Sequence, residues 1–82
     1  MSAIVVYILS SPNTPYLYKG HTSNLISRIT SHNKLGKGWT SRYRPWQVIH
    51  IEWFKTKEEA MLRQKWLKSG AGRDWIKKNI IY

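Results

Sequence analysis

The sequence predicts an α/β (α+β) sandwich, in which helices flank a three-stranded, mainly antiparallel sheet in the order β-β-α-β-α, with a short C-terminal helix. Two β-branched and aromatic runs near the N-terminus are joined by a connection too short for a parallel crossover. A third such run lies mid-chain, between segments of helical periodicity. Because the 82 residues contain no repeat or linker, we expect one domain covering residues 1–82.

The first two strands form a predicted hairpin. Residues 3–10 are apolar and rich in β-branched types, residues 11–15 supply turn-forming serine, asparagine and proline, and residues 16–20 return as a strand. The first run has no basic segment before it and is far too short to cross a membrane, so we expect a buried strand.

The first helix is expected to begin at Thr22 or Ser23, because either hydroxyl can accept hydrogen bonds from the N–H groups of a first turn. Its apolar face extends to about His32. That face consists of Leu25, Ile26 and Ile29.

A basic loop and a third strand follow. Residues 34–45 carry two glycines, four basic residues and two aromatic residues without a period, which predicts a loop. Residues 46–54 alternate and are rich in β-branched and aromatic types, which predicts a strand. We expect Glu52 to point outward from this strand and His50 to be structural.

The last part of the chain is predicted to be helical. Thr56, with Glu59 three residues later, indicates a capping box at the start of a helix over residues 57–69. Gly70 is expected to end this helix, and residues 74–78 to form one more short helical piece. The expected inner face of the long helix holds Ala60, Met61, Gln64 and Leu67.

The composition narrows the class of partner. Fourteen Lys and Arg against four Asp and Glu give a net charge of +10, which favours a polyanion, and nucleic acid is the first candidate. A ribosomal or membrane-surface basic protein is the alternative on charge alone. The chain has no cysteine, which excludes disulfides and thiolate zinc sites, so we expect a cytoplasmic location.

Polar residues with catalytic chemistry recur at the predicted elements. Tyr7 lies in the first strand and Tyr18 in the second, while Arg28 and His32 are four residues apart and so share a helix face. If that face looks toward the hairpin, two phenols, a guanidinium and an imidazole converge. Phosphodiester cleavage needs a general base, a cation for the developing charge and a metal ion at the leaving oxygen.

In these residues the sequence resembles the GIY-YIG nuclease family, in particular its small stand-alone bacterial members, over nearly the whole chain. Val6-Tyr7-Ile8-Leu9 stands at the GIY position and Tyr18-Lys19-Gly20 at the YIG position. The match continues through residues 20–25, Arg28, 32–33, 44–46, 59–60 and 67–70. The resemblance implies a DNA endonuclease that hydrolyses phosphodiester bonds with one Mg²⁺ or Mn²⁺ ion.

The resemblance also assigns roles to catalytic residues. Arg28 matches the arginine that holds the scissile phosphate, and Tyr7 and Tyr18 match the motif tyrosines, one of which acts on the attacking water. His32 matches a histidine or tyrosine that contacts the phosphate or assists the base. His21 falls where some relatives place a lysine beside the metal-bound water. A phenol with a pKa near ~10 needs a nearby cation to act as a base near neutrality.

Position 64 departs from the family pattern. In the family, the second long helix carries a glutamate that is the only protein ligand of the metal; here the matching residue is Gln64. A neutral amide is a poorer ligand for a hard dication than a carboxylate, so we expect impaired catalysis. Gln64 is either an introduced change or a natural departure in a member that binds without cutting. We favour the first, because the other motif positions suit catalysis.

Basic and aromatic residues are expected to contact DNA, which is the predicted partner of a monomer or homodimer that does not associate with membranes. The candidate substrates are branched, damaged or single-stranded DNA. A non-catalytic DNA-binding module and an RNA- or ribosome-associated protein are the alternatives. Lys77 and Lys78 could add phosphate contacts. The principal predicted DNA contacts are Lys19, Lys34, Lys37, Trp39, Arg42, Tyr43, Arg44 and Arg73.

Overall fold

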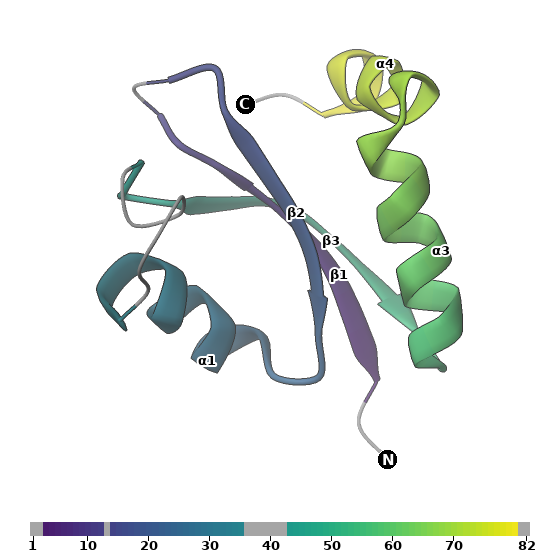
Figure 1. Cartoon of the computed structure of the whole chain (residues 1–82), viewed down its shortest axis with the longest axis horizontal. Coiled ribbons are helices and arrows are strands. Elements are labelled where there is room, and N and C mark those ends of the chain that lie inside the picture. The colour runs from purple at the N-terminus through teal and green to yellow at the C-terminus, as the bar shows by residue number, and fades with distance from the viewer. Residues whose placement is uncertain (1–2, 13, 36–42, 81–82) are drawn as a thin grey trace.

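The computed structural model describes residues 3–12, 14–35 and 43–80 (Figure 1). The sheet has the strand order β2-β1-β3, and both strand pairs are antiparallel, which confirms the predicted α+β class. Within the described ranges, none of the helices is long and apolar enough to cross a membrane. The elements are β1 (Ile4–Ser10), β2 (Leu17–Thr22), α1 (Leu25–Thr30), a π-helical turn η1 (Ser31–Leu35), β3 (Gln47–Phe54), α3 (Lys57–Lys68) and α4 (Gly70–Asn79).

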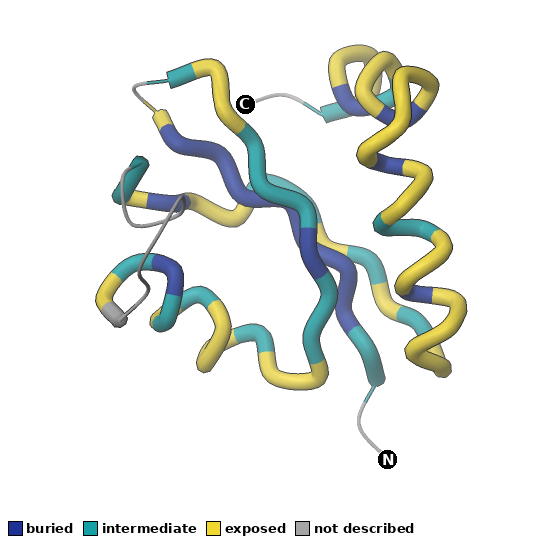
Figure 2. The backbone as a smooth tube through the Cα atoms, in the orientation of Figure 1, coloured by how far each residue is buried: buried dark blue, intermediate teal, exposed yellow. Residues whose placement is uncertain are grey.

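Strand β1 is the buried centre of the fold. It runs between the two other strands, and its residues from Val5 to Ser10 are buried, as the dark blue stretch in Figure 2 shows. Its side chains alternate between two apolar clusters, one on each face of the sheet. The continuous apolar run in the sequence therefore reflects a strand that is covered on both faces.

Helix α1 lies on one side of the sheet and helices α3 and α4 lie on the other (Figure 1). On the α1 side, Leu25 and Ile29 pack against a cluster of buried residues: Val5, Tyr7, Leu9 and Trp46. On the opposite side, Val6 and Ile8 pack with Ala60, Leu67 and Ile76. The two faces of the sheet consequently carry different sets of packed residues.

The caps of the helices confirm one prediction and correct another. Thr56 caps α3 as predicted, since its Oγ1 accepts a hydrogen bond from the Glu59 N–H at 3.2 Å. The predicted cap of α1 was wrong, because Asn24 caps that helix by accepting from the Ser27 N–H at 3.1 Å. Thr22 instead accepts from the Asn24 N–H, in the turn before the helix.

The junction of α3 and α4 also differs from the prediction. Gly70 does not end the first helix but begins α4, because Ser69 is both the last cap of α3 and the N-cap of α4, where its Oγ accepts from the Gly72 N–H. The helical piece expected over residues 74–78 is thus the middle of a ten-residue helix. Gly72 allows this turn, since a Cβ there would lie 2.0 Å from the Trp66 carbonyl oxygen.

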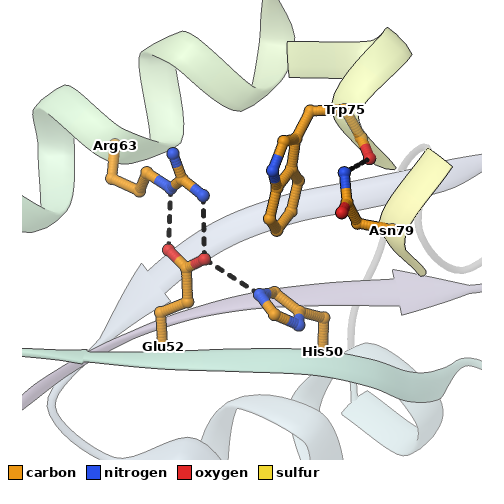
Figure 3. Close-up of polar contacts among 5 residues, drawn as sticks. All are labelled: His50, Glu52, Arg63, Trp75 and Asn79. Carbon is orange, nitrogen blue, oxygen red and sulfur yellow. Dashed lines mark hydrogen bonds and ion pairs between the residues drawn. The ribbon is translucent and has the colours of Figure 1, made fainter. Parts of the chain in front are cut away.

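Three residues predicted on inner or outer faces lie elsewhere. Ile26 was expected on the apolar face of the first helix but is 80% exposed. Met61 is 50% exposed, because the buried face of α3 is centred on Ala60 and Leu67. Glu52 does not point to solvent. It pairs across the sheet with Val6, so it faces α3, where Arg63 donates to it from Nε at 2.8 Å and from a second nitrogen at 3.0 Å (Figure 3).

This carboxylate joins β3 to both C-terminal helices. His50 Nε2 donates to Glu52 at 2.9 Å, and the Arg63 guanidinium lies 4.8 Å from the ring of Trp75 (Figure 3). The same guanidinium lies 4.6 Å from the ring of Trp66. Burial opposes ionisation of Glu52, but the hydrogen bonds from Arg63 and His50 outweigh it, and the pKa of the carboxyl is lowered. The contact gives His50 the structural role predicted for it.

Replacing Glu52 with Gln should destabilise the fold by about 2 kcal/mol, because Arg63 loses a charged partner in a partly buried site. The expected fall in melting temperature is about 10 °C for a domain of this size. The folded pKa lies below the unfolded value of about 4.3, so this stabilisation is present above that value and is lost as the pH falls through the folded pKa.

Thermal melts at about pH 6 and about pH 3 test this prediction, since the difference in melting temperature between parent and variant should be smaller in acid. Glu58→Gln, an exposed change in the first turn of α3, is the control and should cost about 0.5 kcal/mol or less. A gap of the same size at both pH values would show that the ion pair is not its source.

Candidate active site

Tyr7 lies in the middle of β1 and is fully buried. Its register partner on β2 is Gly20, and a Cβ built at Gly20 would lie 2.5 Å from the Tyr7 phenol oxygen and 3.0 Å from Tyr18 Cε1. No side chain therefore fits at position 20 without displacing a tyrosine. Gly20 therefore leaves the space that the Tyr7 phenol occupies.

His32 completes the hydrogen bonding of this phenol. The Tyr7 hydroxyl and His32 Nε2 lie 3.1 Å apart, and the Tyr18 and His32 ring centroids lie 4.5 Å apart. His32 is 6% exposed, and η1 carries it inward after α1 ends. The two phenols and the imidazole thus share one buried corner on the α1 face.

The neighbouring loop holds η1 in place. Asn33 accepts a hydrogen bond from the Trp46 N–H at 2.6 Å and donates to the Trp46 carbonyl at 3.1 Å. Arg44 Nε donates to the His32 carbonyl at 2.9 Å. These bonds tie η1 to the start of β3 and so position the imidazole.

Arg28 places a permanent positive charge over the phenols. Its hydrogen bond with Tyr7 and its proximity to Tyr7 and Tyr18 raise the pKa of the guanidinium. Burial raises the pKa of Tyr7 despite that bond, and burial, followed by the charge of Arg28, lowers the pKa of His32. Near neutrality the site therefore contains a neutral phenol, a neutral imidazole able to accept the phenol's proton, and a cation.

Gln64 occupies the other face of β2. Its Oε1 accepts a hydrogen bond from His21 Nδ1, and its Nε2 donates to the Lys19 carbonyl at 3.3 Å. The carbonyl can only accept, so the orientation of the amide is fixed, and His21 carries its proton on Nδ1. Lys19 and His21 alternate with Tyr18 and Gly20 along the strand, which places them toward α3.

Two hollows at the end of β2 connect the phenol cluster on one face of the sheet with Gln64 on the other face. A groove of about 310 Å³ is lined by both His21 and Arg28, together with Lys57, Thr22 and Ser23. A second hollow, of about 210 Å³, lies beside it and is also lined by His21. Its other lining residues are Met61, Gln64, Lys65 and Lys68. The structure thus brings Tyr7, Tyr18, Arg28 and His32 together, and it links Gln64 to them through His21.

The residues around Gln64 do not fit a divalent cation. Its amide oxygen is neutral and already accepts from His21, whereas Mg²⁺ prefers carboxylates. The chain has four Asp and Glu residues, and none of them lines either hollow. Across the described part of the chain, no three His, Cys, Asp or Glu side chains gather as a metal site would require.

The predicted DNA contacts are dispersed. Lys34 is exposed, whereas Arg44 is engaged with His32, and Tyr43 packs against Tyr16 with ring centroids 4.6 Å apart. Lys19 and Arg73 line a common pocket beside α4. The predictions for Lys37, Trp39 and Arg42 fall outside the described residues.

Lys57 was missed by the sequence analysis. It lines the groove with Arg28 because the start of α3 packs beside the end of β2. No local pattern indicates that contact, since the two segments are more than thirty residues apart. Helix Lys57–Lys68 was predicted, but its approach to β2 was not.

Comparison with known proteins identifies the family. The model of the GIY-YIG catalytic domain matches residues 3–73, and the chain therefore belongs to the GIY-YIG family. This confirms the resemblance seen in the sequence. Membership indicates a nuclease-type function, with DNA as the substrate that such a domain implies.

The chain is also similar to UPF0213 proteins. It is 35% identical over 79 residues to one from Staphylococcus haemolyticus, which covers 94% of each chain. It is 38% identical over 64 residues to one from Clostridium perfringens, covering 77% of this chain and 68% of the relative. It is 42% identical over 53 residues to the UPF0213 protein YazA of Bacillus subtilis, covering 62% of this chain and 52% of the relative. No solved structure shows significant similarity.

Replacing Gly20 with Ala should destabilise the fold by about 2 kcal/mol, because the added methyl group must displace a fully buried phenol. The displaced Tyr7 should also lose its hydrogen bond with His32. Chemical denaturation measures the first effect, and the NMR titration of His32 reports the second.

Gly70→Ala is the matched control. Its Cβ would meet nothing within 4 Å, and the higher helix propensity of alanine should leave stability unchanged or raise it by up to about 1 kcal/mol. Equal stabilities for the two alanine variants would contradict the packing of Tyr7 over Gly20.

Proposed function

We propose that this chain binds DNA with a backbone phosphate at Arg28, beside Tyr7, Tyr18 and His32, and acts as a nuclease-type domain whose hydrolysis is impaired by Gln64. The observation that carries the proposal is the convergence of two phenols, an imidazole and a permanently charged guanidinium. Arginine suits this position because its planar fork matches phosphate oxygens.

The proton chemistry follows from the contacts of Tyr7. With the His32 tautomer that leaves Nε2 unprotonated, the Tyr7 hydroxyl donates to Nε2 at 3.1 Å, and a proton taken by the phenol oxygen from an attacking water could then pass to the imidazole. Arg28 would stabilise the negative charge that develops on the phosphate. The raised pKa of Tyr7 opposes ionisation of the phenol. The residues present therefore support phosphate binding better than rapid hydrolysis.

GIY-YIG nucleases generally use a divalent metal. Such an ion stabilises the leaving oxygen and lowers the pKa of water. In this chain position 64 offers an amide that is held by His21 and Lys19, so we infer weak metal binding and slow cleavage. With a carboxylate at position 64, the proposed ion is a single Mg²⁺ or Mn²⁺.

The proposed substrates are branched, damaged or single-stranded DNA in the cytoplasm, bound by a monomer or homodimer. A second function, DNA binding without cleavage, is favoured by the two hydrogen bonds of Gln64. Donation from its Nε2 to the Lys19 carbonyl is a contact that a carboxylate cannot make. The Gln64 amide therefore has a structural role in this chain.

Gln64→Glu should make the stability of the domain depend on metal. Without metal the variant should be less stable than the parent by about 1 kcal/mol, because the carboxylate loses the bond to the Lys19 carbonyl. Mg²⁺ or Mn²⁺ at a hundredfold excess over Kd should then stabilise the variant by about 2.7 kcal/mol. Thermal melts with and without each ion provide the measurement.

Met61→Glu is the control for this experiment, since it adds a carboxylate to the same hollow at a half-exposed position while Gln64 keeps its contact with His21. It should show no comparable metal dependence. If the metal ion stabilised the parent chain as much as it stabilises Gln64→Glu, the inferred role of position 64 would be contradicted.

Cleavage by the Gln64→Glu variant tests the enzymatic part of the proposal. With Mg²⁺ or Mn²⁺ it should cut labelled DNA faster than the parent, and adding Arg28→Ala should lower its rate by about 10²-fold or more. The substrates are branched, damaged, single-stranded and duplex DNA, assayed on denaturing gels.

Lys55→Ala removes an exposed positive charge on the segment between β3 and α3 and should leave the rate nearly unchanged. A Gln64→Glu variant that binds DNA but never cuts it would establish the binding module instead. Tighter binding of RNA than of DNA at matched salt would overturn the proposed substrate.

A further inference from the structure

A basic pocket lies between β2 and α4, on the sheet face opposite the phenols. It has a volume of about 270 Å³, and Leu17 and Ile76 contribute its apolar lining. Lys19 enters from β2, while Arg73 and Lys77 enter from α4, where their spacing of four residues places them on one helix face. The pocket thus combines apolar walls with three converging cations.

Among the residues that the structure describes, no carboxylate side chain lines this pocket. The ion pairs of the described residues involve Glu52 with His50 and Arg63, and none involves Lys19, Arg73 or Lys77. Burial, followed by the nearby charges of Arg73 and Lys68, lowers the pKa of Lys19. Like charges at short range repel one another, and a bound anion would offset that repulsion.

The pocket is connected to the phosphate site through β2. Lys19 and His21 are two residues apart on the same strand face, which corresponds to about 7 Å. The Gln64 side chain contacts both residues, and His21 lines the groove that contains Arg28. Strand β2 is an edge of the sheet, so these sites follow an edge that no other strand of the described ranges covers.

We propose that the pocket formed by Lys19, Arg73 and Lys77 binds a second backbone phosphate of the DNA strand that is held at Arg28. The inference rests on the proposed function and extends it from one phosphate to a path along β2. Tyr16 packs against Tyr43 but remains 42% exposed at the pocket, so the exposed part of its ring can contact a base next to this phosphate. A single-stranded segment is thereby favoured as the bound form.

The test compares two variants that each lose one positive charge. Arg73→Gln removes a pocket residue of α4, whereas Lys55→Gln removes an exposed charge that does not line the pocket. Fluorescence anisotropy with a labelled single-stranded oligonucleotide gives Kd over a range of salt concentrations. Circular dichroism melts establish that both variants are folded.

The pocket variant should bind more weakly than the control, and the slope of log K against log salt should fall by about 0.7 for each lost phosphate contact to a single strand. Lys19→Met, which keeps most of the apolar stem of the side chain but removes its charge, should reproduce the loss. Equal affinities and slopes for the pocket and control variants would overturn the inference.

Arg28→Ala separates this inference from the proposed function. If Arg28→Ala weakens binding while the pocket variant matches its control, the pocket inference fails and the proposed function stands. If the pocket variant weakens binding while Arg28→Ala does not, the proposed phosphate site fails. The last experiment is an NMR titration with inorganic phosphate. If phosphate shifts the signals of Arg73 and Lys77 and the oligonucleotide does not displace it, the assignment of the pocket to DNA is overturned.

Discussion

The close approach of the Tyr7 phenol to Gly20 is the constraint on which the site depends. The phenol can lie in the buried centre of the sheet because its register partner on β2 has no side chain. A buried hydroxyl needs a hydrogen-bond partner, and His32 lies within hydrogen-bonding distance on the segment that follows the hairpin. Arg28 adds a positive charge near Tyr7. The same burial raises the pKa of Tyr7, so the packing that orders the site also opposes ionisation of the phenol.

Alternation along β2 divides the functional residues between the two faces of the sheet. Tyr18 faces the phenol cluster, whereas Lys19 and His21 face α3, where the Gln64 side chain contacts both. Because β2 is an edge strand, the groove that contains Arg28 and His21 can pass around its end. A side chain on α3 can therefore influence chemistry on the opposite face without crossing the buried strand.

Local chemistry predicted the strands, the hairpin, the Thr56 cap and the position of the phenols. The errors arose where a distant segment decides the outcome. Glu52 was expected to be exposed, but the face that it shares with His50 is covered by α3, whose Arg63 reaches it. The extent of α4 was missed because its first turn depends on the Ser69 cap and on packing of Gly72 against α3. The contact of position 64 with His21 is equally non-local.

The distribution of charge is the physical reason why we expect the residue at position 64 to have a large effect on metal binding. The four acidic residues lie away from the hollows beside β2, and Glu52 is already paired with Arg63 and His50. Such a basic edge attracts phosphates and repels a free dication. A carboxylate at position 64 would provide the local negative charge that a metal ion needs there, whereas the amide leaves the edge suited to a polyanion. The cations along it are Lys19, Arg28, Lys57, Lys65, Lys68, Arg73 and Lys77.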